Sequence, residues 1–190
     1  MFKLIALDMD GTLLKGDNTI SQETKKAIKL AKDKGIKIVI TTGRPLQGVM
    51  NYLEELGLIN DDEYVITYNG SSVYNTKTLE PIVRNGITGK DFKDIYKLSK
   101  HLGVEFHGFT NECCIAPQKN KYTEAEILHN NIDVKIIDIE NDINDTDFII
   151  KAMILDEKEK LDEAVKKIPK EYFEKYNALR TVSLDRKSVV

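Results

Sequence analysis

The sequence predicts an α/β fold with a parallel sheet, followed by a second region of mixed helices and strands. Short apolar runs alternate with helical stretches over the first third of the chain, and three of these runs end in polar loops. After about Glu80 the alternation gives way to shorter strand-like runs. With 190 residues and 41% hydrophobic content, the chain can form one sizeable core or two small domains.

The first predicted strand is KLIALDM (3–9), an apolar run typical of a strand that is buried on both faces of a sheet. Ser21 then opens a helical stretch with apolar residues on one face, and Gly35 closes it. The second strand, IKIVITT (36–42), is rich in β-branched residues.

The next helix has Pro45 in its first turn and ends at Gly57, and a third strand, YVITY (64–68), follows it. Strands that alternate with helices in this way are connected by right-handed crossovers and form a parallel sheet.

A second region begins near Pro81 and the glycine-containing stretch NGITG (85–89). This region has the size of an ordinary separate domain, and its mixed pattern predicts an α+β domain. We expect helices at about 90–102, 121–130 and 157–168, and strands at 104–109, 113–117, 134–138, 148–155 and 178–185.

Two acids, Asp8 and Asp10, follow the first strand in the motif DMDGTLL. Functional groups of parallel α/β sheets collect beyond the carboxyl ends of the strands, so both carboxylates can face one site. Gly11 lets the backbone turn tightly and approach a ligand. Thr12 and the amides near it can donate hydrogen bonds to an anion.

The second and third strands deliver further polar groups to the same edge. ITTGRP places Thr42, Gly43 and Arg44 between a strand and a helix, where a hydroxyl, amides and a guanidinium suit a phosphate. The third strand ends at Asn69 and Gly70. Less specific interpretations remain open: Thr42 as a helix N-cap, Arg44 as a surface residue, and Asn69-Gly70 as an ordinary turn.

Paired acids repel a phosphate unless a cation lies between them, and Mg²⁺ suits carboxylate, carbonyl and phosphate oxygens. The chemistry that fits is covalent phosphoryl transfer, in which Asp8 attacks phosphorus and Asp10 protonates the leaving oxygen and then activates water. Thr42 and Mg²⁺ would stabilise the transferring group. A calcium loop fits less well, because a strand rather than a helix precedes the acids.

The motifs DMDGTLL, TTGRP and YVITYNG resemble those of the haloacid dehalogenase superfamily, and more narrowly of its Cof-type phosphatases. The resemblance implies the first half of a Rossmann-like core at 1–82 and an α+β, C2-type cap domain at 83–190. It implies Asp8 as nucleophile, Asp10 as general acid and base, and Mg²⁺ bound by Asp8 and the Asp10 backbone carbonyl. Thr42 matches the second family motif, while Arg44 and Asn69 match positions that line the cleft between core and cap.

Two later family motifs, a lysine and a Gly-Asp-x-x-Asn-Asp-like loop, have no counterpart in this sequence. No glycine follows Gly108, and neither Lys151 nor Lys187 has a convincing context. We therefore expect a chain that lacks the second half of the core and has little or no phosphatase activity. The first strand would then lie at a sheet edge, where it could self-associate.

Composition excludes several other classes of protein. The net charge of −3 gives no basic footprint for nucleic acid, and the chain start resembles neither a signal peptide nor a membrane span. The adjacent Cys113 and Cys114 form no disulfide framework, which indicates a cytoplasmic protein. The resemblance implies small phosphorylated metabolites as partners, such as sugar phosphates or a flavin or pyridoxal phosphate. The alternatives are a phosphomutase and a non-catalytic truncated product that acts only as a binding or oligomerising module.

Overall fold

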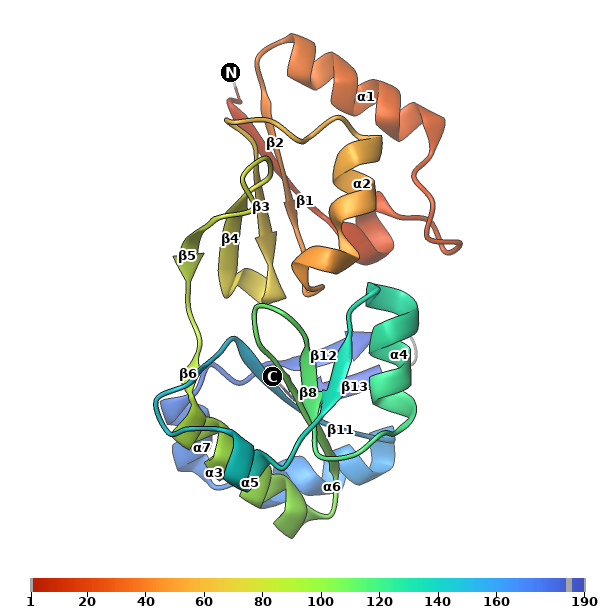
Figure 1. Ribbon diagram of the computed structural model, residues 1–190. Coiled ribbons are helices and arrows are strands. Elements are labelled where there is room, and N and C mark those ends of the chain that lie inside the picture. Colours follow the sequence, from red (N-terminus) through yellow and green to blue (C-terminus); the bar gives the residue numbers. More distant parts are fainter. Residues whose placement is uncertain (1, 184–185, 190) are drawn as a thin grey trace. The chain divides into compact units, whose positions relative to one another are not determined.

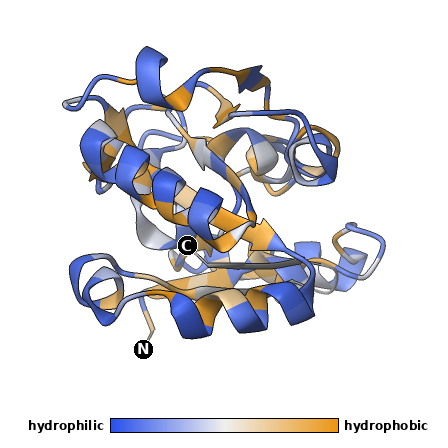
Figure 2. Ribbon diagram, turned by 90° about the horizontal axis from the view of Figure 1, so that it is seen from below, coloured by the Kyte–Doolittle hydropathy of each residue, from blue (hydrophilic) through white to orange (hydrophobic). Residues whose placement is uncertain are grey.

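The computed structural model describes residues 2–183 and 186–189, and the chain forms two compact units (Figure 1). One unit comprises Met1–Asn85 and the other Gly86–Val190, and each has its own hydrophobic core. In Figure 2 the strands are largely hydrophobic and the outer helix surfaces largely hydrophilic, as expected for helices that bury one face. None of the helices among the described residues combines the length and apolar character needed to cross a membrane.

The first unit is built on a sheet with the strand order β1-β2-β3-β4-β5. β1, β2 and β3 pair in parallel, which confirms the predicted α/β class, whereas β4 and β5 extend the sheet in antiparallel fashion and were not predicted. Its elements are β1 (Leu4–Asp8), η1 (Met9–Leu13), α1 (Gln22–Asp33), β2 (Lys37–Thr41), η2 (Leu46–Gly48), α2 (Met50–Glu55), β3 (Tyr64–Thr67), η3 (Tyr68–Gly70), β4 (Ser72–Asn75) and β5 (Pro81–Arg84).

The predicted ends of the first helix are confirmed. The Ser21 hydroxyl accepts a hydrogen bond from the Thr24 backbone N–H at 3.1 Å, which satisfies one of the free amides at the start of α1. Beyond the end of α1, Gly35 has a φ of +74°, a conformation that L side chains rarely adopt. These local signals fix where the chain leaves the helix and returns to the sheet.

The prediction that the first strand is buried on both faces is wrong. Ile5 and Leu7 of β1 pack into the core, but Leu4 is 53% exposed and Ala6 is also exposed. Residues of both α1 and α2 pack into the same core, so these two helices cover one face of the sheet (Figure 1). The other side chains of β1 have no helix over them in the described chain, and β1 lies at the sheet edge, as expected.

The second unit has a sheet with the order β12-β13-β11-β7-β8-β9 and a separate pair, β6 and β10. The single strand expected at 148–155 is divided, because β10 pairs with β6 whereas β11 pairs with β7. Part of the strand expected at 178–185 forms β12, and residues 184 and 185 lie outside the described residues. The elements are β6 (Ile87–Thr88), α3 (Gly89–Leu102), β7 (Glu105–Phe109), β8 (Cys114–Ala116), α4 (Lys121–Asn130), β9 (Val134–Ile136), α5 (Ile139–Asp142), β10 (Phe148–Ile149), β11 (Lys151–Asp156), α6 (Lys158–Lys167), α7 (Lys170–Lys175), β12 (Arg180–Ser183) and β13 (Arg186–Val189).

Four buried residues of the second unit, His107, Cys114, Glu126 and Lys151, are grouped around the Glu126 carboxylate. His107 Nε2 lies 3.9 Å from Glu126 Oε1, and both side chains are almost fully buried. Glu126 belongs to α4, which leaves Leu128 80% exposed. Helix α4 is therefore held in place partly by polar side chains rather than by an apolar face alone.

Burial within this cluster changes the ionisation of its members. It raises the pKa of the Cys114 thiol, and the nearby Glu126 carboxylate adds to that effect. Burial also lowers the pKa of Lys151 to about 8, and Glu126 opposes part of this change. Lys151 is thus an ammonium group that folding destabilises.

We predict that Lys151 makes the stability of the protein rise with pH in the alkaline range. Above about pH 8 the folded protein loses this proton, while the unfolded chain keeps it until roughly pH 10. The free energy of unfolding should therefore rise by about 3 kcal/mol across that window. Urea denaturation at several pH values would measure it. Lys151→Met should remove the rise in stability with pH. The control Lys97→Met changes an exposed lysine and should keep the rise. Equal pH dependence in the two variants would show that Lys151 is not its source.

Candidate active site

The polar residues that the sequence singled out lie on three neighbouring loops at the carboxyl ends of β1, β2 and β3. Asp8 lies opposite Thr41 in the β1–β2 ladder, and Thr41 lies opposite Ile66 in the β2–β3 ladder. Backbone hydrogen bonds continue this alignment into the loops, since Asn69 N–H donates to the Thr42 carbonyl at 3.0 Å. The parallel register therefore brings the three loops to one edge of the first unit.

The loop after β1 turns sharply at Asp10 and Gly11. Their backbone angles, −79°/116° and 80°/0°, are those of a type II turn, which requires a positive φ at its third residue. Gly11 meets that requirement without a steric penalty. The Thr12 hydroxyl, predicted as an anion donor, donates to Asp8 Oδ2 at 3.2 Å and so orients that carboxylate.

The loop after β2 is held by Thr42, which is almost fully buried. Its hydroxyl accepts a hydrogen bond from the Arg44 backbone N–H at 3.1 Å, so it stabilises the turn that precedes Arg44. At Gly43 there is no room for a side chain, because an added Cβ would lie 2.2 Å from Asn69 Oδ1. Gly43 and Asn69, predicted separately, are therefore in direct contact.

The loop after β3 has three consecutive residues with positive φ, namely Tyr68 at 50°, Asn69 at 58° and Gly70 at 93°. A tyrosine in this region is uncommon, and such a conformation costs about 1–3 kcal/mol. Tyr68 is buried, and its N–H donates to the Arg44 carbonyl at 3.1 Å. Packing and hydrogen bonds hold the loop in this shape.

Arg44 and Asp10 form a bidentate ion pair. Arg44 Nη2 donates to Asp10 Oδ1 at 2.6 Å, and Nε donates to Oδ2 at 3.0 Å. Burial of the guanidinium lowers the pKa of Arg44, but the hydrogen bonds and charge of Asp10 raise it by more, so Arg44 stays charged. Both residues were predicted as site candidates from the sequence, but their pairing with each other was not predicted.

Two further residues complete the surroundings of Arg44. Its Nη1 lies 3.5 Å from the Gly48 carbonyl oxygen, and its guanidinium carbon lies 5.8 Å from the centre of the Tyr52 ring. Neither residue was predicted to belong to the site. Tyr52 lies eight positions after Arg44, a helical spacing that could have indicated the same side of this segment.

Comparison with known proteins assigns the family. The sequence model of the haloacid dehalogenase-like hydrolases matches residues 5–186. The chain belongs to this family. The expected resemblance is thereby confirmed, and the α/β fold with a parallel sheet agrees with that of solved members.

Individual relatives agree with the family assignment. The Bacillus subtilis protein YxeH, provisionally named a phosphatase, is 38% identical over 186 residues, which are 95% of this chain and 67% of YxeH. The 5-amino-6-(5-phospho-D-ribitylamino)uracil phosphatase YcsE of B. subtilis is 33% identical, covering 74% of this chain and 55% of YcsE. A haloacid dehalogenase-like hydrolase from Bacteroides thetaiotaomicron shares the fold with a TM-score of 0.83 at 21% identity, over 100% of this chain and 71% of that one. This chain spans about two thirds of the length of YxeH and of a Streptococcus pyogenes relative.

Phosphatases of this superfamily generally use Mg²⁺, and the residues present fit a weakly bound ion. Mg²⁺ commonly binds one or two carboxylates together with phosphate oxygens of the substrate. The Asp8 carboxylate and the Asp10 backbone carbonyl are oxygen donors of this kind, while the Asp10 carboxylate is engaged by Arg44. Across the described residues, no group of three or more His, Cys, Asp or Glu side chains is placed to hold a metal.

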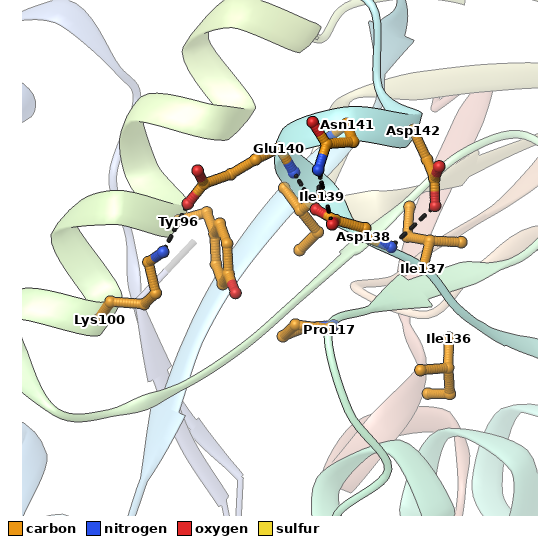
Figure 3. A pocket seen from close by; sticks show the side chains of 10 residues that line it. All are labelled: Tyr96, Lys100, Pro117, Ile136, Ile137, Asp138, Ile139, Glu140, Asn141 and Asp142. Atoms are coloured by element: carbon orange, nitrogen blue, oxygen red, sulfur yellow. Dashed lines mark hydrogen bonds and ion pairs between the residues drawn. The ribbon is translucent and has the colours of Figure 1, made fainter.

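A pocket of about 620 Å³ lies in the second unit and contains none of the predicted site residues (Figure 3). Lys100 pairs with Glu140, while the Asp138 and Asp142 carboxylates accept hydrogen bonds from uncharged N–H groups. The pocket therefore keeps a negative charge, which does not suit a phosphate. The edge of the first unit, rather than this pocket, carries the groups that suit phosphoryl transfer.

We predict that Gly43→Ala destabilises the protein through its contact with Asn69. The added methyl group must displace the Asn69 side chain, and such overpacking typically costs about 1–3 kcal/mol. Urea denaturation would measure the loss. In an Asn69→Gly background, which removes the obstructing side chain and suits the positive φ, the same substitution should cost much less. Equal costs in both backgrounds would refute the contact as the cause.

Proposed function

We propose that this chain carries the nucleophile-bearing part of a Mg²⁺-dependent phosphatase that hydrolyses small phosphorylated metabolites through an aspartyl-phosphate. Residues 1–82 would be the first half of the catalytic core and residues 83–190 a cap domain. The observation that carries the proposal is the position of Asp8: it lies at the carboxyl end of β1, oriented by Thr12 and beside the loops of Thr42 and Arg44. An exposed carboxylate that is oriented by a hydroxyl and followed by a tight turn suits attack on a phosphate.

The residues divide the chemistry between two steps. An Asp8 carboxylate oxygen attacks phosphorus, the bond from phosphorus to the substrate oxygen breaks, and Asp10 gives that oxygen a proton. Asp10 then takes a proton from water, which attacks the phosphoryl group and releases phosphate, so that Asp8 is restored. Thr42, Gly43, Arg44 and Asn69 would hold the phosphate, with Thr12 keeping Asp8 in place. Bound at Asp8 and the Asp10 carbonyl, Mg²⁺ would offset negative charge on the transferring group.

Support for the substrate class comes from relatives, since the name of YcsE specifies a phosphorylated ribitylamino compound, which resembles a sugar phosphate. The buried, free Cys113 and Cys114 suit a reducing, cytoplasmic setting. The exposed edge of β1 suits self-association, although nothing in the fold requires it. A phosphomutase would share both acids and would differ in returning the phosphoryl group to a substrate.

We predict that acetyl phosphate and Mg²⁺ phosphorylate this chain at Asp8. Intact mass measurement should show one added phosphoryl group that hydroxylamine removes, and Asp8→Asn should show none. Asp10→Asn is the matched control two residues away and should still be phosphorylated, because acetate leaves without needing a proton. Labelling of Asp8→Asn, or of neither the native chain nor Asp10→Asn, would refute Asp8 as the nucleophile.

We also predict that the 190-residue chain releases little phosphate from an aryl phosphate in steady state. The sequence has no counterpart of the lysine and acidic loop found late in the family, so the transferred group and Mg²⁺ would be held weakly. A colorimetric assay with and without Mg²⁺ would test this. Robust turnover that depends on Mg²⁺ and is lost in Asp8→Asn would show that these residues suffice.

A further inference from the structure

The ion pair between Asp10 and Arg44 conflicts with the roles proposed for the two residues. Asp10 is to face the leaving oxygen, and Arg44 is to bind the phosphate. In the structure, two donors of Arg44 are instead directed at both oxygens of the Asp10 carboxylate. While this pair is intact, Asp10 is turned away from a leaving oxygen, and the two-donor edge of Arg44 is not open to a phosphate.

The structure also indicates which partner of the pair is fixed. The Arg44 side chain is only 14% exposed, and it lies near the Gly48 carbonyl and the Tyr52 ring. Its backbone is held on both sides, by the Thr42 hydroxyl and by the Tyr68 N–H. The Asp10 side chain is 56% exposed and lies in a turn. Asp10 can thus move away while Arg44 stays in place.

We propose that Asp10 occupies the anion-binding side of Arg44 in the phosphate-free protein and that an incoming phosphate displaces it. A carboxylate and a phosphate both offer two oxygens to a guanidinium, so they compete for the same pair of donors. The exchange itself is independent of catalysis. Its consequence, that displaced Asp10 becomes free to face the leaving oxygen, rests on the proposed function.

This exchange would link the arrival of substrate to the release of the general acid. Without phosphate, Asp10 is held by two hydrogen bonds and cannot turn toward a reacting oxygen. When phosphate binds Arg44, these hydrogen bonds are transferred to phosphate oxygens and Asp10 is released. Competition of this kind lowers the apparent affinity for phosphate by the fraction of molecules in which Arg44 is unoccupied.

The test is binding of inorganic phosphate to the 190-residue chain without metal, measured by calorimetry. Asp10→Asn should bind phosphate roughly tenfold more tightly than the native chain, because the competing carboxylate is gone. Asp33→Asn is the matched control: it removes the same charge from an exposed residue of α1 that lies outside the loops of the site. It should change the affinity less than about threefold, as expected for a general charge effect. The gain in Asp10→Asn should disappear when Arg44→Gln is added.

A second readout follows the pair directly. In NMR of the chain labelled with nitrogen-15 and carbon-13, the Arg44 Nε–H signal should shift when phosphate is added. A matching shift of the Asp10 carboxyl carbon should report its release. An Asp10 signal that stays constant while phosphate binds would overturn the exchange.

Three binding results would also overturn it: equal gains in Asp33→Asn and Asp10→Asn, a gain that survives Arg44→Gln, or no phosphate binding even in Asp10→Asn. None of these depends on phosphorylation of Asp8. Failure of acetyl phosphate to label Asp8, combined with the tenfold gain in Asp10→Asn, would refute the proposed function and leave the exchange intact.

Discussion

The site depends on the parallel register of β1, β2 and β3. Because Asp8, Thr41 and Ile66 lie side by side across these strands, the three loops that follow leave the sheet at the same level. The hydrogen-bonding pattern then continues past the strands, with Asn69 bonded to Thr42 and Tyr68 to Arg44. A slip of one residue in any pairing would turn every side chain of that strand to the other face and separate the acids from the loops of Thr42 and Asn69.

This arrangement places like charges close together in a small space, and the structure compensates with one guanidinium. Arg44 neutralises Asp10, leaving Asp8 with the Thr12 hydroxyl as its neighbour. The third loop provides another form of compensation: its left-handed residues are conformationally unfavourable, but their N–H groups reach the second loop and fix it. Strain of this kind persists where surrounding packing determines the backbone, as burial of Tyr68 does. The cost is small beside the core that supports it.

Local chain signals made much of the first unit predictable. The strands and the capped helix α1 follow from apolar periodicity, Ser21 and Gly35, and the position of Asp8 follows from its place at a strand end. What the sequence could not predict depends on contacts between distant segments. The antiparallel β4 and β5, the exposure of Leu4 and the Asp10–Arg44 pair all depend on which segments lie beside one another, and apolar runs or single motifs do not encode that. The domain roles and the functions of the site residues remain predictions.

Burial and attraction by a carboxylate act on both Arg44 and Lys151, but they change the two pKa values in opposite directions. Arg44 is hydrogen-bonded to the Asp10 carboxylate. This attraction outweighs the cost of burying the guanidinium, so the pKa of Arg44 rises. Lys151 is buried more completely, and Glu126 acts on it only through charge attraction. The cost of burying the ammonium group outweighs that attraction, so the pKa of Lys151 falls. The helix α4 that supplies Glu126 exposes Leu128, which a pattern of apolar residues would have placed inside. Where polar groups occupy the interior, the pattern of apolar and polar residues no longer indicates which side chains are buried. The buried face of a helix such as α4 must then be inferred from the charged groups that pair there.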